Sequence, residues 1–200
     1  GEGNTLYDQT GNGHDGLLIG DPSWVDGYTL SSLLGDINFD ELINVYDAVM
    51  LVAIMLNHEQ GTELQRNSCD TNQDGVIDIE DIVLLFEWIL DLDMNSRRPI
   101  SSGEYNLLDE SIIISSDGDI GGFQITLLNK DVEIDLPLPP AWDYSRKGNQ
   151  LVAYGIDGSS LPDDFQLFIK DPKAVQSIKL AGWNRTSVYA KREIIPESFS

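Results

Sequence analysis

The stretch DINFDELINVYD, residues 36–47, returns 34 residues later as DTNQDGVIDIED, residues 70–81. Both copies carry oxygen-bearing side chains at loop positions 1, 3, 5, 9 and 12, and apolar runs follow them at 48–56 and 82–90. Calcium takes about 6–8 oxygens, and a loop of this spacing supplies them, with a backbone carbonyl at position 7. The repeat therefore predicts two bound calcium ions. The predicted ligands are Asp36, Asn38, Asp40, Leu42, Asn44, Asp47, Asp70, Asn72, Asp74, Val76, Asp78 and Asp81.

These loops differ from an EF-hand, which has a helix on both sides and usually ends in Glu. Here position 12 is Asp47 or Asp81, and residues 29–35 before the first loop show no helical pattern. The duplicated loop-then-helix unit resembles a type I dockerin over about residues 33–93. That resemblance implies a calcium-binding interaction module whose partner is a cohesin-like domain. The sequence departs from the family pattern at Glu41, which stands at a turn position that usually carries Gly. This position favours positive φ, which glycine adopts most easily.

The helix expected after the first loop is apolar on every side over 48–56. A surface helix normally shows an apolar stripe about 100° wide, so we expect another surface to cover this one, the nearest being the second half of the chain. In dockerins, loop positions 10 and 11 commonly meet the partner. Because these positions differ between the two copies, we do not expect the two-fold-symmetric binding of some dockerins. The predicted partner-binding residues are Val45, Tyr46, Val52, Ile79 and Glu80.

Beyond the helical module the pattern changes to period two, with apolar residues alternating cleanly at 122–127. Short strands punctuated by turn residues predict an antiparallel β-sandwich over 105–195, after a linker at 99–104. The stretches 119–127 and 148–154 resemble a cohesin-like sandwich, the usual receptor for dockerins. The predicted fold class is therefore α+β and multi-domain. The predicted strands are 111–115, 122–127, 132–136, 151–156, 165–169, 175–180 and 187–194.

Both ends of the chain are expected to be remnants of longer segments. Residues 1–28, with a Gly-Asn-Gly turn, predict a β-hairpin before a helical module at 29–98. They resemble the opening of a laminin-G-like jelly roll, so a truncated domain, or a strand lent to a neighbouring sheet, stays an alternative. Residues 195–200 resemble the lead-in to the sorting tail of type IX secretion substrates, with 196–200 left before a removed tail. This resemblance implies a bacterial cell-surface protein.

The composition narrows the partners and the compartment. The chain has 34 acidic and 12 basic residues, a formal net charge of −22. This excess argues against nucleic acid, which needs basic patches, and against anionic membranes. No apolar stretch is long enough to span a membrane. Cys69 is the single cysteine, so no internal disulfide forms, and we expect it to be a small buried packing residue. Calcium is abundant outside cells, so we expect a secreted protein.

The sequence favours a function without catalysis, because it has no nucleophile elbow, phosphate loop, zinc-protease motif or Cys–His pair. The hypothesis is a secreted, calcium-stabilised interaction or scaffolding protein. Its partner is a cohesin-like domain of the same or a neighbouring chain, and contacts that do not close give head-to-tail oligomers or filaments. The alternative is an anchoring and carbohydrate-recognition fragment of a larger cell-surface polysaccharide-degrading enzyme. Trp142, Tyr144 and Trp183 are its candidates for stacking on sugar, although core packing or interface anchoring is favoured for them.

Overall fold

The computed structural model describes residues 5–6, 14–17, 19–20 and 33–193, and the chain divides into two compact units, Gly1–Ser31 and Ser32–Ser200. The first unit contains an antiparallel hairpin of β1 (Thr5–Leu6) and β2 (Gly16–Leu17), in which Thr5 pairs with Leu17. Most of the stretch that resembles a jelly roll, and the C-terminal stretch 195–200, lie outside the described residues.

The second unit begins with a helical module of three helices. They are α1 (Val45–Met55), α2 (Glu63–Cys69) and α3 (Ile79–Leu90). Each helix starts at a capping box, in which the cap side chain and the side chain three residues later each accept the other residue's backbone N–H. Because of these caps, α1 and α3 each begin three residues before the apolar runs at 48–56 and 82–90. The short helix α2, in the insert between the two loops, was not predicted.

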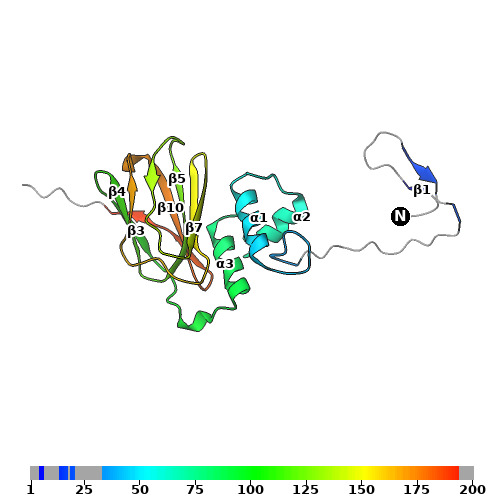
Figure 1. Ribbon diagram of the computed structural model, residues 1–200, viewed down its shortest axis with the longest axis horizontal. Helices are drawn as coiled ribbons and strands as arrows, with labels where there is room; N and C mark the ends of the chain where they lie inside the picture. The colour runs from blue at the N-terminus through cyan, green and yellow to red at the C-terminus, as the bar shows by residue number, and fades with distance from the viewer. Residues whose placement is uncertain (1–4, 7–13, 18, 21–32, 194–200) are drawn as a thin grey trace, which may run out of the picture. The chain divides into compact units, whose positions relative to one another are not determined.

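The first helix is only partly covered. Leu51 and Val52 pack with α3 in one apolar core, but Val45 and Val49 are 52% and 62% exposed. The chain's own sandwich, the nearest candidate cover, therefore leaves this face of α1 exposed. The sandwich instead packs against α3, as Figure 1 shows, and α1 packs against the other side of α3.

A β-sandwich of two five-stranded sheets forms the rest of this unit, which confirms the predicted α+β class. One sheet has the strand order β11-β10-β5-β8-β7 and the other β12-β3-β4-β9-β6, and only β12 and β3 pair in parallel. The strands are β3 (Gly103–Leu107), β4 (Ser111–Ser116), β5 (Ile120–Leu127), β6 (Ile134–Asp135), β7 (Trp142–Lys147), β8 (Gln150–Gly155), β9 (Phe165–Ile169), β10 (Val175–Gly182), β11 (Thr186–Tyr189) and β12 (Lys191–Arg192).

Two apolar cores meet at one sheet. The inner faces of both sheets enclose a core that includes Phe123, Ile125 and Leu167. The opposite face of β8 and β10 contributes Val152, Tyr154 and Ala181 to the core of the helical module. The central strands β8 and β10 are thus buried on both faces, which explains the uninterrupted apolar run at 151–154.

The linker differs from its predicted bounds. The chain leaves α3 at Asp91, which has a left-handed backbone, passes a short 3-10 helix (Met94–Ser96) and enters β3 at Gly103. Ile100 is buried, and its N–H donates to the Thr186 hydroxyl at 3.0 Å. The connection therefore packs against the sandwich.

A second 3-10 helix, Pro172–Ala174, precedes β10.

Candidate calcium and docking site

Carboxylates shape the first loop. The Asp36 carboxylate accepts the backbone N–H groups of Asp40 and Glu41 at 3.1 and 2.9 Å. The Asn38 side-chain oxygen accepts the N–H of Asp40 at 2.8 Å, and the Asp40 carboxylate accepts the N–H of Leu42 at 3.0 Å. These bonds hold the side chains of positions 1, 3 and 5 within one tight turn.

The second loop repeats each of these bonds. The Asp70 carboxylate accepts from the N–H groups of Asp74 and Gly75 at 3.1 and 2.9 Å. The Asn72 oxygen accepts from Asp74 at 3.0 Å, and the Asp74 carboxylate accepts from Val76 at 2.8 Å. The 34-residue repeat in sequence is therefore a repeat in structure.

The last loop position buries a carboxylate in each copy. Asp47 accepts the N–H groups of loop positions 2 and 9 at 2.8 and 3.0 Å, and Asp81 accepts those of the same positions at 2.8 Å each. Both side chains are completely buried, and among residues 33–193 no Lys or Arg forms an ion pair with either. Burial raises the pKa of Asp81 to about 6, against backbone hydrogen bonds that lower it. A buried carboxylate without a counter-charge is unfavourable, and a cation beside it favours its charged form.

The turn position is left-handed in both loops, as expected from its usual glycine. Glu41 has φ of 68° and Gly75 has φ of 88°. A residue with a Cβ in this region costs about 1–2 kcal/mol, so the first loop has a strained residue where the second has none. In both loops position 4 is also left-handed, at Phe39 and Gln73.

The donor set of both loops fits a hard dication. Each loop offers carboxylate and amide oxygens and a position-7 carbonyl, which are the ligands that calcium prefers. Among the described residues, no three His, Cys, Asp or Glu side chains gather as a metal-binding group. The fit rests on the oxygen chemistry of the loops and on the buried carboxylates of Asp47 and Asp81. A bound ion would supply the positive charge that these two side chains lack.

A glycine pair lets α3 lie directly on the sheet. A Cβ on Gly122 would be 2.8 Å from both Ile79 and Val83, and one on Gly121 would be 2.8 Å from Trp183. Side-chain carbons essentially never come this close, so the helix keeps its position only over glycine. Phe86 of α3 also stacks on Tyr154 of β8, with ring centroids 5.6 Å apart.

Polar contacts surround this apolar contact. Lys179 of β10 forms an ion pair with Asp78, which is loop position 9 and the N-cap of α3. Its ammonium group lies 3.5 Å from the Glu80 carboxylate, and the Ser187 hydroxyl donates to Glu80. Burial lowers the pKa of Lys179, but the bond and charge of Asp78, with Glu80, leave it above its ordinary value.

The far end of α3 is fixed by a second buried acid. The Glu87 carboxylate accepts the backbone N–H of Asn184, in the turn between β10 and β11, where Asn184 and Arg185 both have positive φ. Burial raises the pKa of Glu87, and the bonds from this turn lower it. Arg97 of the connection lies 5.8 Å over the Trp183 ring and donates to the Gly158 carbonyl at 2.7 Å.

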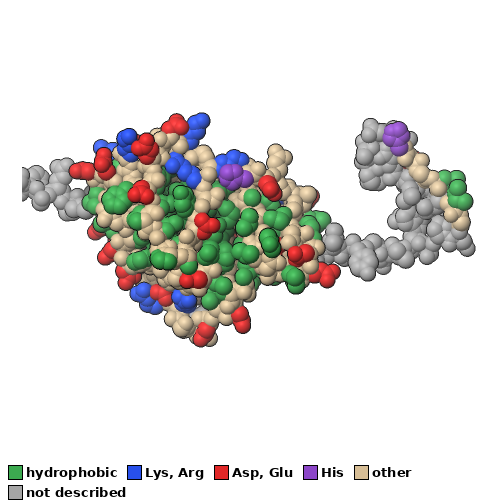
Figure 2. All heavy atoms as spheres, viewed as in Figure 1, with side chains coloured by type: hydrophobic (Ala, Val, Ile, Leu, Met, Phe, Trp, Pro, Cys, Tyr) green, Lys and Arg blue, Asp and Glu red, His purple; other side chains and the backbone are tan. Residues whose placement is uncertain are grey.

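The repeat shows that only one of two related helix faces is covered. Shifting by 34 residues, Ile79, Glu80 and Val83 of α3 correspond to Val45, Tyr46 and Val49 of α1. The residues on α3 contact the sheet, whereas those on α1 are all more than half exposed. On the face drawn in Figure 2, apolar side chains gather over the helical module with acidic side chains around them.

Loops rich in oxygen donors, each leading into a helix and duplicated about a shared core, define a module with the donor set of a calcium site. The model of the dockerin type I domain matches residues 34–90. Dockerin domains bind calcium and mediate protein–protein interaction, typically with cohesins; they are non-catalytic, though they often attach to enzymes. Proteins with dockerins are typically extracellular or on bacterial cell surfaces. Neither the curated proteins nor the solved structures gave a match to the chain.

The structure separates the five predicted partner-binding residues. Ile79 and Glu80 lie in the contact with the chain's own sandwich, and Val52 is buried in the helical core. Val45 and Tyr46 are exposed. The predicted calcium ligands lie in the two loops, and their binding of two ions stays a prediction.

The sandwich side of this contact was not predicted from the sequence. Gly121, Gly122 and Lys179 were not singled out, although two adjacent glycines in a strand signal the close approach of another element. Glu87, the one charge in the second apolar run, marked the end of the contact. Of the three aromatic residues considered for sugar stacking, Trp142 and Trp183 are buried, which confirms core packing and interface anchoring for them.

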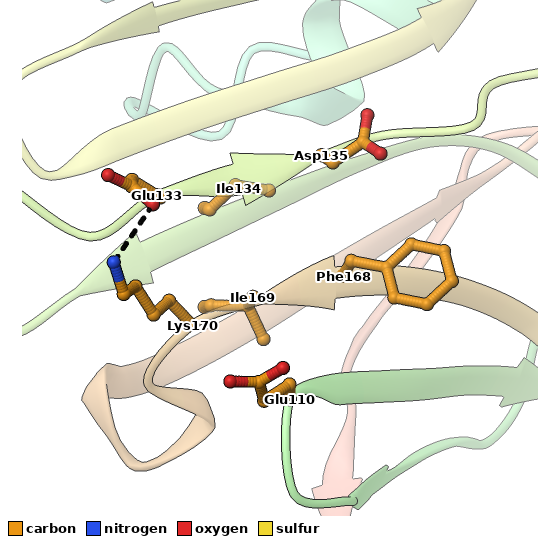
Figure 3. A pocket seen from close by; sticks show the side chains of 7 residues that line it. All are labelled: Glu110, Glu133, Ile134, Asp135, Phe168, Ile169 and Lys170. Carbon is orange, nitrogen blue, oxygen red and sulfur yellow. Dashed lines mark hydrogen bonds and ion pairs between the residues drawn. The ribbon is translucent and has the colours of Figure 1, made fainter.

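An open pocket lies on the other sheet, away from the loops (Figure 3). Lys170 and Glu133 form an ion pair at 3.3 Å on one side, and the exposed ring of Phe168 lies on the other. Its lining combines three carboxylates with one lysine and contains no Ser, Cys or His. Among the described residues, no helix is long and apolar enough to cross a membrane.

The buried thiol of Cys69 gives a test of loop integrity. Cys69 ends α2, is completely buried and has its pKa raised to about 12, mainly by burial. Because it directly precedes the second loop, we expect a thiol reagent to label it at least tenfold faster after chelation of calcium than before. Equal labelling rates in calcium and in chelator would show that the loop does not protect this residue.

Proposed function

We propose that this chain is a secreted, non-catalytic, calcium-stabilised interaction protein that uses the two related faces of its helical module for different partners. The α3 face binds the chain's own sandwich, and the α1 face binds a cohesin-like β-sandwich of another protein. One observation carries the proposal: Val45, Tyr46 and Val49 are exposed at positions whose counterparts on α3 contact a sheet.

The α1 surface has the chemistry of a docking site. Val45 and Val49 can lie on a flat sheet as Ile79 and Val83 do, and Tyr46, which is 71% exposed, offers an aromatic ring with a polar end. Tyrosine is among the residues that most often carry the binding energy of an interface. Because Tyr46 replaces the acid of the other copy, the partner sheet needs no cation in the place of Lys179.

Self-assembly would require a free sheet on a second copy. The sheet that receives α3 is already covered in this chain, so a head-to-tail filament forms only if α3 leaves it. This supports a partner sandwich on a different protein, and it predicts a monomeric native mass for the chain alone. The calcium loops support a place outside the cell, and the match to dockerins, which are typically extracellular or on bacterial cell surfaces, supports a place at the bacterial surface.

Replacing Tyr46 with Asp tests the proposal. With type I cohesin domains as the probe and millimolar calcium present, we expect the unaltered chain to bind at least one of them. Tyr46→Asp should weaken that binding about 30-fold or more, because hot-spot residues contribute about 2 kcal/mol or more. Calorimetric titration measures it.

Phe168→Asp is the matched control, because the Phe168 ring is 48% exposed on β9, in the sheet opposite the one that receives α3. It should bind as the unaltered chain does. Equal binding by Tyr46→Asp would show that the α1 face is not the docking site. Failure of all the cohesin domains to bind would contradict the proposed partner.

A further inference from the structure

The two calcium loops differ at position 9. In the first loop this position is Asn44, whose side-chain oxygen accepts the N–H of Tyr46 at 2.9 Å. In the second loop it is Asp78, whose carboxylate accepts the N–H of Glu80 at 2.9 Å and also forms an ion pair with Lys179. No cation of residues 33–193 pairs with the first loop.

Lys179 reaches the second loop from a different part of the fold. It lies on β10 of the sandwich, 101 residues along the chain from Asp78. The side chains of Lys179, Asp78 and Glu80 are 11%, 9% and 14% exposed, so water screens these charges little. Lys179 can hold this place only while α3 lies on the sheet.

We propose that Lys179 lowers the calcium affinity of the second loop and couples that loop to the docking of α3 on the sandwich. A calcium ion in the second loop shares the negative charge of Asp78 with the ammonium group of Lys179, and the two cations repel each other. The first loop has no such competitor. Coupling between two binding events is reciprocal. Calcium in the second loop therefore weakens the contact of Lys179 with Asp78 by the same factor by which Lys179 weakens calcium binding.

The consequence is a division of roles between the loops. Calcium in the first loop stabilises the module and its exposed α1 face, independently of the sandwich. The calcium affinity of the second loop also depends on whether α3 is docked on the sandwich. This inference rests on calcium binding by both loops, as in the proposed function.

Calcium titration by calorimetry tests the coupling in chains that keep one working loop. In Asp36→Ala, where the second loop remains, adding Lys179→Met should tighten calcium binding about tenfold, the effect of removing a nearby charge in a partly solvated site. In Asp70→Ala, where the first loop remains, the same change should leave the affinity unaltered. Lys170→Met, which removes an exposed ion pair of the other sheet, is the control and should change neither affinity.

A second measurement covers the case in which a one-loop chain does not fold. In a chain with both loops, Lys179→Met alone should raise the calcium affinity of one of the two binding steps and leave the affinity of the other step unchanged. Unchanged steps, or weaker binding after Lys179→Met, would overturn the inference while leaving the proposed function intact. No calcium binding by the unaltered chain would overturn both.

Discussion

Adding a chelator to the calcium-loaded protein is expected to lower its Tm by about 10–20 °C. Each bound ion adds about 2.7 kcal/mol to the free energy of unfolding when free calcium is 100 times Kd, so two ions add about 5 kcal/mol. A change of 1 kcal/mol shifts Tm by about 2–4 °C for a domain of this size. The physical reason is that Asp47 and Asp81 are buried without a Lys or Arg partner among the described residues, and a bound cation supplies the counter-charge that their backbone hydrogen bonds do not. Thermal unfolding in calcium and in chelator measures the shift.

Asp36→Ala combined with Asp70→Ala should remove most of the difference in Tm between the protein in calcium and the protein in chelator. Both carboxylates also accept loop N–H groups, so the variant is expected to melt earlier even in chelator. The quantity to compare is therefore the difference in Tm between calcium and chelator. Glu59→Ala, at an exposed acid outside the loops, is the control and should keep the full difference. A double variant with an unaltered difference would rule out these loops as the source of calcium stabilisation.

Gly122→Leu is expected to force α3 off the sheet and to lower the free energy of unfolding by about 3 kcal/mol or more. Even one carbon at this position would lie 2.8 Å from Ile79 and Val83, and leucine adds four. Overfilling a packed core by a few carbons costs about 1–3 kcal/mol, and occasionally more. The expected fall in Tm is about 6–12 °C.

Hydrogen exchange of residues 79–90 distinguishes undocking from general unfolding. In Gly122→Leu, amides of α3 should exchange faster while those of β4 and β9, in the other sheet, keep their protection. Glu104→Leu adds the same side chain at an exposed position of β3 and should leave α3 protected. Unchanged exchange and Tm in Gly122→Leu would mean that α3 is not held on the glycine pair.

The sequence was most informative where one residue type performs one local task. The loop spacing located both calcium loops, because position 1 must present an oxygen and position 6 must turn. The strand predicted at 165–169 has the same bounds as β9, in which Phe165, Leu167 and Ile169 alternate on the buried face. The strand β7 was missed, since its exposed charged residues hide the pattern.

The packing between the modules could not be predicted from local pattern. The apolar character of both helices indicated a covered surface, but it did not say which helix the sandwich would cover. That choice depends on shape: Gly121 and Gly122 leave room for Ile79 and Val83, and Lys179 meets an acid that only the second copy carries. Such complementarity joins residues about 40 to 100 positions apart, and no short window along the chain contains both sides.

The distance along the chain between α3 and its sheet also sets the order of folding. The contacts that bury α3 come from β5, β8 and β10, and the last of these ends at Gly182. Contacts between residues this far apart close large loops, and chains dominated by them fold slowly. During synthesis, the apolar face of α3 therefore emerges long before the strands that cover it. We infer that docking is the late step of folding, and that a chain interrupted before β10 presents an uncovered, aggregation-prone helix.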